Sequence, residues 1–213
     1  MTVVRLYEAN IKRLPNEIGY LKQTRMLLLY KNDLKELPKD IGTLRRLEFL
    51  NLDWNQLQHL PPEIGMLDQL KTLRLRNNCL TSLPKEIGKL KLLESLRVAG
   101  NKLTELPDVI GELKCLNELN VFNNRLEQLN VNVCKLTNLR ILDIANNRIR
   151  ELPLEVAELR NLSRFFRNGN PWDNPWTSHY SIPQLLRRLE TGKNSKNLWY
   201  FKRGFMVIGI LAA

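Results

Sequence analysis

Apolar residues recur along this chain in a block of 23 residues, with leucine at most of the fixed positions. The block reads L-x-x-L-x-L-x-x-N-x-L-x-x-L-P-x-x-I-G-x-L-x-x. Its LP..IG segment, or a degenerate copy of it, begins at Leu14, Leu37, Leu60, Leu83, Leu106, Leu129 and Leu152. One block cannot bury its own apolar stripe, so we expect successive blocks to stack around a shared core.

The spacing of apolar residues predicts one strand and one helical turn in each block. Alternating leucines such as Leu73 and Leu75 predict a short strand with both side chains pointing inward. After each proline, apolar residues such as Ile87 and Leu90 return at helical spacing, which predicts a short helix or 3₁₀ turn over 85–93. We expect eight parallel strands, centred near Arg5, Leu28, Asn51, Arg74, Arg97, Asn120, Asp143 and Phe166.

An asparagine recurs where the chain leaves each predicted strand. The positions are Asn32, Asn55, Asn78, Asn101, Asn124, Asn147 and Asn170. An amide can donate to and accept from backbone groups of neighbouring coils that would otherwise be buried without partners, so we expect a structural asparagine ladder. Ala9 occupies this position in the first block, and no cap precedes it. We therefore expect either a frayed N-terminus or a chain that is part of a longer one.

The block resembles the leucine-rich repeat over roughly residues 1–175. Its short LP..IG form is similar to the repeats of intracellular Ras-associated scaffold proteins and their plant relatives. The resemblance implies an α/β leucine-rich repeat solenoid (horseshoe), with a parallel concave sheet of about eight strands and a helical C-terminal cap. We expect the solenoid over 1–170, the cap over 171–203 and an apolar tail over 204–213.

The repeat breaks after Asn170, where Pro171 and Trp172 replace the usual continuation. An apolar stripe then predicts a helix that covers the last coil: Ile182, Leu185, Leu186 and Leu189. We expect Trp172 and Trp176 to pack within this cap, which is similar to the C-terminal cap of one Ras-associated family member. The run from Phe205 to Ala213 is too short to span a bilayer, so we expect no membrane association.

The formal net charge of +11 is concentrated in the C-terminal quarter. From Arg160 onward, nine Lys and Arg residues face two Asp and Glu residues. These basic residues are dispersed over the predicted cap, which favours a solvated face over a nucleic-acid site. We expect no nucleic-acid binding, and we keep the binding of an anionic surface through this region as an alternative.

The chain lacks the motifs of catalysis and metal binding. Its two histidines, His59 and His179, belong to no H-E-x-x-H sequence, and Cys79, Cys115 and Cys134 lie in separate repeats. An odd number of cysteines and the lack of a signal-peptide pattern favour a reducing, cytoplasmic compartment. We therefore expect no enzyme activity, no metal and no cofactor.

Residues that the motif leaves free are the candidates for binding. Strand residues that do not enter the core line the predicted concave face, where Arg74, Arg76 and Arg97 should form a basic centre with Asp53 beside it. Four aromatic side chains should be exposed around that centre: Tyr7, Tyr30, Trp54 and Phe122. Aromatic residues and arginine carry much of the binding energy at protein interfaces, so we interpret this face as a partner site. The alternative is a merely solvated surface.

These observations predict a monomeric, non-enzymatic scaffold or adaptor for intracellular signalling that binds a protein on its concave face. The family resemblance implies a small GTPase, its regulators or an adhesion adaptor as the partner. A different interpretation is that the chain is the recognition or regulatory fragment of a larger multidomain protein.

Overall fold

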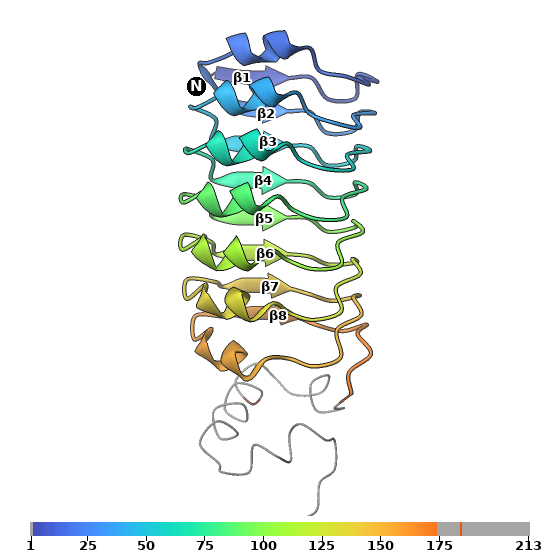
Figure 1. Cartoon of the computed structure of the whole chain (residues 1–213), viewed down its shortest axis with the longest axis vertical. Helices are drawn as coiled ribbons and strands as arrows, with labels where there is room; N and C mark the ends of the chain where they lie inside the picture. The colour runs from blue at the N-terminus through green and yellow to red at the C-terminus, as the bar shows by residue number, and fades with distance from the viewer. Residues whose placement is uncertain (1, 174–183, 185–213) are drawn as a thin grey trace, which may run out of the picture.

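A computed structural model describes residues 2–173 and residue 184. Figure 1 shows an open stack of coils, in which the strands lie on one side and short helices on the other. The strands are β1 (Thr2–Arg5), β2 (Thr24–Leu28), β3 (Phe49–Asn51), β4 (Thr72–Arg74), β5 (Ser95–Arg97), β6 (Glu118–Asn120), β7 (Ile141–Asp143) and β8 (Arg164–Phe166). They form one parallel sheet in chain order, so the predicted leucine-rich repeat solenoid and its eight strands are confirmed.

Each strand pairs with the next at a constant offset of one block. Leu50 lies opposite Leu73, and Leu73 lies opposite Leu96. From β3 onward, the predicted strand centres are the last residues of three-residue strands. Hydrogen bonds between coils nevertheless continue past the strands, because the Leu52 N–H donates to the Arg74 carbonyl at 2.8 Å. The pairing between coils therefore extends beyond the residue at which each strand is assigned to end.

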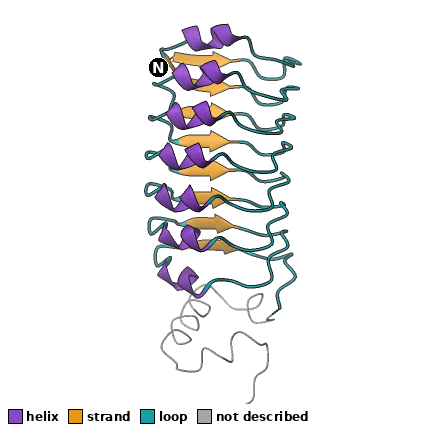
Figure 2. Ribbon diagram, viewed as in Figure 1, coloured by secondary structure: helices purple, strands orange, loops and turns teal. Residues whose placement is uncertain are grey.

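The layer opposite the sheet consists of five-residue 3₁₀ helices, which Figure 2 shows in purple. They are η1 (Asn16–Tyr20), η2 (Lys39–Thr43), η3 (Pro62–Met66), η4 (Lys85–Lys89), η5 (Asp108–Glu112), η6 (Val131–Lys135) and η7 (Leu154–Glu158). A proline in extended conformation precedes each helix except η6, where the Asn130 side chain accepts a hydrogen bond from the Asn132 N–H. The fixed φ of proline suits this position, since a helix start needs no internal donor.

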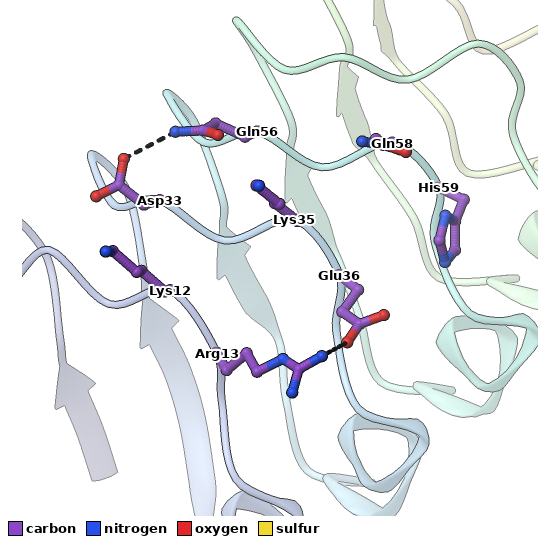
Figure 3. Close-up of a pocket in the computed structure, with 8 residues that line it drawn as sticks. All are labelled: Lys12, Arg13, Asp33, Lys35, Glu36, Gln56, Gln58 and His59. Atoms are coloured by element: carbon purple, nitrogen blue, oxygen red, sulfur yellow. Dashed lines mark hydrogen bonds and ion pairs between the residues drawn. The ribbon is translucent and has the colours of Figure 1, made fainter.

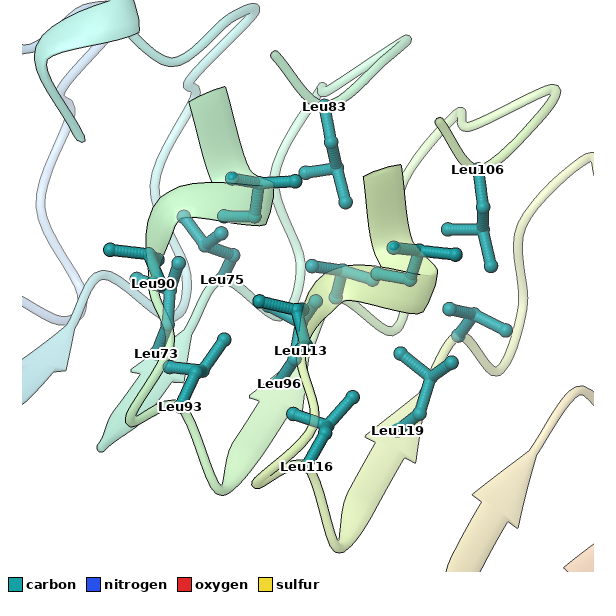
Figure 4. Close-up of a cluster of buried hydrophobic side chains, with 14 of the residues drawn as sticks. Leu73, Leu75, Leu83, Leu90, Leu93, Leu96, Leu106, Leu113, Leu116 and Leu119 are labelled. Atoms are coloured by element: carbon teal, nitrogen blue, oxygen red, sulfur yellow. The ribbon is translucent and has the colours of Figure 1, made fainter. Parts of the chain in front are cut away.

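Leucine side chains from both layers fill the space between them, as Figure 4 shows for the central coils. Leu73, Leu96 and Leu119 are fully buried and succeed one another across the sheet. The helices also approach one another closely: a Cβ atom built on Gly65 would lie 2.4 Å from the Glu86 carbonyl oxygen. Glycine at this position of the block lets neighbouring 3₁₀ helices stack backbone against side chain.

Every ladder asparagine joins its own coil to the preceding coil. The Asn78 amide donates to the carbonyls of Leu52 and Leu75 at 2.9 and 3.1 Å, and its oxygen accepts from the Leu57 N–H at 3.0 Å. The same bonds recur in each block up to Asn170. These side chains supply partners for backbone groups that the stacked coils remove from water.

The C-terminal end of the described solenoid carries Trp172, which is half-buried and packs against the hydrophobic core. Trp176, the cap-helix stripe and the tail from Phe205 to Ala213 lie outside the described residues, as do the basic residues beyond Asp173. Within the described part of the chain, no helix is long and apolar enough to cross a membrane.

Candidate functional site

We use the term sheet face for the outward side of the sheet, together with the turn residues that follow each strand. It corresponds to the predicted concave face. All eight predicted site residues lie on it, because each occupies a strand or turn position of its block: Tyr7, Tyr30, Asp53, Trp54, Arg74, Arg76, Arg97 and Phe122. They differ, however, in exposure and in pairing.

Aromatic side chains occupy the N-terminal third of the sheet face. The rings of Tyr7 and Tyr30 stack with centroids 4.6 Å apart and an angle of 10° between their planes. Tyr30 is half-buried in this stack, whereas Tyr7 is 38% exposed and Trp54 is 59% exposed, as predicted. Beside the stack, Lys31 Nζ lies 2.6 Å from Glu8 Oε1, and this hydrogen bond raises the pKa of Lys31. The expected exposed aromatic surface is thus concentrated at Trp54.

The basic centre is largely neutralised, which the sequence analysis did not anticipate. The Asp53 carboxylate is buried and accepts from Arg74 Nε at 2.8 Å, Arg74 Nη2 at 2.7 Å and the Arg76 N–H at 2.7 Å. Arg97 Nη2 lies 2.8 Å from Glu118 Oε2, which also accepts from the Ser95 hydroxyl at 2.9 Å. Two of the three arginines therefore have carboxylate partners, and Arg76 differs from both.

The C-terminal third of the sheet face is acidic and aromatic. Asp143 accepts from Asn120 Nδ2 at 3.3 Å and from the Ala145 N–H at 3.1 Å, while burial raises the pKa of its carboxyl. Phe122 is only half-buried in place of the full exposure expected, whereas Phe166 is 51% exposed. Phe166 therefore offers the larger exposed aromatic surface of the two.

Glu118 and Phe166 were missed as site residues. Glu118 occupies the strand position that aligns with Ser95 and Thr72, one column before those that the sequence analysis considered. Phe166 was predicted as the centre of the last strand but was not selected as a binding residue. A search of every outward strand position for charge complementary to Arg97 would have found Glu118.

The turn residue after each strand has a left-handed backbone. Asparagine occupies this position at Asn77, Asn123 and Asn146, with φ of 53°, and glycine at Gly100, with φ of 67°. Both residue types adopt this conformation readily. Trp54 adopts it with φ of 59°, although a bulky side chain there is uncommon and costs about 1–2 kcal/mol. No packing requirement explains a largely exposed tryptophan at this position.

A second surface feature is an open recess among the loops at the side of the stack, shown in Figure 3. Arg13 is paired there with Glu36 at 3.5 Å, and Gln56 donates to Asp33 at 2.8 Å. His59 lines the same recess and lies on an exposed loop. The charges are mixed and exposed, so the recess holds no concentrated chemical group.

Metal ligation has no support in the part of the chain that the structure describes, where no group of three His, Cys, Asp or Glu residues could hold an ion. The three cysteines differ in burial: Cys79 is half-buried, Cys115 is exposed and Cys134 is buried in the place of the repeat glycine.

Comparisons with known proteins agree with this architecture. A family model described as a leucine-rich repeat region matches residues 39–128, and a leucine-rich repeat model matches residues 138–159. The comparison with curated proteins finds no match. The chain is a leucine-rich repeat protein.

Solved structures extend this result. The plant peptide hormone receptor RGFR1, solved in complex with RGF2, is 27% identical with a TM-score of 0.72, over 79% of this chain and 28% of the receptor. A second receptor structure is the ectodomain of the Arabidopsis thaliana receptor kinase GASSHO1/SCHENGEN3 in complex with CASPARIAN STRIP INTEGRITY FACTOR 2. It is 29% identical with a TM-score of 0.63, over 79% of this chain and 24% of the receptor chain.

An internalin (inlF) from Listeria monocytogenes shares the fold at 22% identity and a TM-score of 0.70, over 77% of this chain and 47% of the internalin. The chain thus spans less than half the length of each of these three proteins.

Proposed function

We propose that this protein is a non-enzymatic interaction module that binds a protein partner on its sheet face. The main evidence is Trp54, whose side chain is 59% exposed. Its backbone has a left-handed conformation that asparagine or glycine would adopt at lower energy. Aromatic and arginine side chains lie around it, and these residue types dominate binding energy at protein interfaces. Leucine-rich repeat proteins are generally non-enzymatic binding scaffolds, which agrees with this surface.

The partner class follows from the sequence resemblance. Similarity to the Ras suppressor protein and related Ras-associated scaffolds favours a monomeric adaptor in intracellular signalling that binds a small GTPase, its regulators or an adhesion adaptor. The odd number of cysteines supports a reducing, cytoplasmic setting. Two similar receptors were solved in complex with RGF2 and with CASPARIAN STRIP INTEGRITY FACTOR 2, which supports the use of this fold for holding a protein or peptide partner.

The test is affinity capture from cell extract with the wild-type chain and two double variants. Trp54→Ala with Arg76→Ala alters the sheet face, whereas Tyr20→Ala with Arg148→Ala removes an exposed tyrosine and an exposed arginine elsewhere. Arg74 is left intact, because its loss would strand the buried Asp53 carboxylate.

Quantitative mass spectrometry should find a set of proteins that the wild type and the control variant retain and that the sheet-face variant loses. Thermal melts should show that all three proteins are folded. If the sheet-face variant retains every captured protein, partner binding on this face is wrong.

A further inference from the structure

Arg76 is held in place by its backbone, while its guanidinium attracts the Asp143 carboxylate without forming an ion pair with any described residue. Its N–H donates to Asp53 Oδ1 at 2.7 Å, and its carbonyl accepts from the Trp54 N–H at 2.7 Å. The Arg76 side chain is half-buried, Nε is buried without an acceptor, and no ion pair joins Arg76 to any residue in the described ranges. Arg74 and Arg97, on the same face, each have a carboxylate within 2.8 Å.

The next coil provides nothing that could neutralise Arg76. In phase with Arg76 and Asn77, that coil carries Ala99 and Gly100, and the Asn77 N–H donates to the Ala99 carbonyl at 2.8 Å. Gly100 cannot be larger without strain, since a Cβ there would lie 2.3 Å from Asn77 Oδ1. Small side chains therefore follow Arg76 on the sheet face.

Trp54 lies directly beside Arg76, because the backbone hydrogen bond between them links consecutive coils. Among the described residues the only cation–π contact is between Arg167 and Phe165, so the Arg76 guanidinium does not rest on the Trp54 ring. The sheet face thus presents an exposed apolar ring on one coil and, on the next coil, an arginine that forms no ion pair with the described residues.

We propose that Trp54 and Arg76 together bind an extended acidic segment of a protein partner, in which a Glu or Asp pairs with Arg76 and an adjacent apolar side chain packs on Trp54. This inference rests on the proposed function and specifies its partner chemistry. A partly desolvated arginine without a counter-ion binds a carboxylate through charge-assisted hydrogen bonds. Asp53 and Glu118 already neutralise Arg74 and Arg97, and Asp143 adds a negative charge on the same face, so a segment with an isolated carboxylate fits better than a nucleic acid.

The experiment selects displayed random 12-residue peptides on the immobilised full chain and measures the affinity of synthesised hits by fluorescence anisotropy. Selected peptides should contain Asp or Glu next to an aromatic or aliphatic residue. Arg76→Gln should weaken their binding by roughly tenfold or more, as expected for the loss of one partner of a desolvated charge pair. The matched control Arg148→Gln, at an exposed arginine of the side loops, should leave affinity within about twofold.

Two further variants separate binding from folding. Arg76→Glu should recover affinity for a peptide whose acidic residue is changed to lysine, which a purely structural role for Arg76 would not produce. Trp54→Asn should bind the peptides at least about tenfold more weakly while raising the melting temperature, because asparagine adopts the left-handed conformation more readily.

If the peptides bind Trp54→Asn weakly but bind Arg76→Gln as tightly as the wild type, the pairing of an acidic residue with Arg76 is wrong. Binding on the sheet face is then still supported. If neither variant changes the affinity of the selected peptides, or if the selection yields no peptides, both the pairing with Arg76 and the proposed function are contradicted. A 12-nucleotide single-stranded DNA serves as the polyanion probe. If it binds as tightly as the peptides and depends equally on Arg76, the assignment of an acidic protein segment is wrong.

Discussion

Asp53 and Asp143 are two carboxylates on one sheet whose surroundings act on them differently. Asp53 is buried, but it is neutralised by Arg74 and also accepts the Arg76 N–H. Asp143 is half-buried and accepts hydrogen bonds only from neutral groups, the Asn120 amide and the Ala145 N–H. Burial without a paired cation disfavours the charged carboxylate, which is why the pKa of Asp143 is raised.

Asp143→Asn should stabilise the protein at neutral pH. Burial raises the pKa of Asp143 in the folded state, with smaller opposing effects from the Ala145 N–H, Arg76 and Asn120. The ionised carboxylate therefore lowers the free energy of unfolding above the folded-state pKa, and this penalty disappears below the ordinary value of 3.8, where both states are protonated. Asparagine keeps an oxygen that can accept from Ala145.

Thermal melts of wild type and Asp143→Asn from pH 7 down to pH 3 test this expectation. The variant should melt at a higher temperature at pH 7, and the difference should shrink as the pH falls. A variant that is less stable at pH 7, or a difference that does not change with pH, would contradict the assignment.

At this scale the sequence could place side chains but not pair them. Repeat phase put Trp54, Arg74 and Arg76 on one face, because positions 23 residues apart are equivalent. It could not show that Arg74 turns to Asp53 on the preceding coil, whereas Arg97 turns to Glu118 on the following one. That choice depends on which neighbour carries a carboxylate and on side-chain rotamers, and neither is periodic.

The 3₁₀ helices were predictable in place but not in type. Proline set where each begins, and apolar spacing set which residues face inward. A five-residue element has few internal hydrogen bonds. Its packing against neighbouring coils therefore decides whether it is a 3₁₀ or an α-helix, and the apolar spacing does not specify that packing. Gly65 and Gly88 allow close approach between successive helices, whereas Cys134 and Ala157 fill the same position in the last two.

Gly65→Ala should destabilise the solenoid by about 1–3 kcal/mol, the usual consequence of overpacking. The added methyl would meet the Glu86 carbonyl oxygen at 2.4 Å and Glu86 Cβ at 2.7 Å, and backbone atoms cannot move aside cheaply. Urea denaturation followed by circular dichroism measures the change. Ala157→Gly, at the same position of η7, is the comparison and should shift stability by less. Equal stability of Gly65→Ala and wild type would show that the helices can separate freely.

For the whole molecule, strand number and order were predictable because a single apolar pattern is repeated and each block can pair only with its neighbours. The distribution of candidate binding residues over the sheet was not predictable, because these residues occupy the positions that the pattern leaves free. The sheet face changes from aromatic near Tyr7 and Tyr30, through arginines at its centre, to acidic and aromatic near Asp143 and Phe166.

Stability should also vary along the stack. Strand β1 pairs only with β2, and Ala9 replaces the ladder asparagine in its coil, whereas β4 pairs on both sides and its coil contains Asn78. In repeat proteins each coil is stabilised by its neighbours, so the first coil should open most easily. Hydrogen exchange with mass spectrometry on this chain should show faster exchange for amides of β1 than for those of β4. Equal protection would indicate that the stack opens as one unit.

The constant register of the sheet also sets a scale of length for anything laid along it. Successive strands of a sheet are about 4.8 Å apart, whereas an extended peptide advances about 3.3 Å per residue. Three residues of such a peptide thus cover almost the same distance as two coils. Partner residues three apart in sequence would meet equivalent positions on alternate coils, so the sheet face would read a partner by the periodicity of its side chains as well as by their identity.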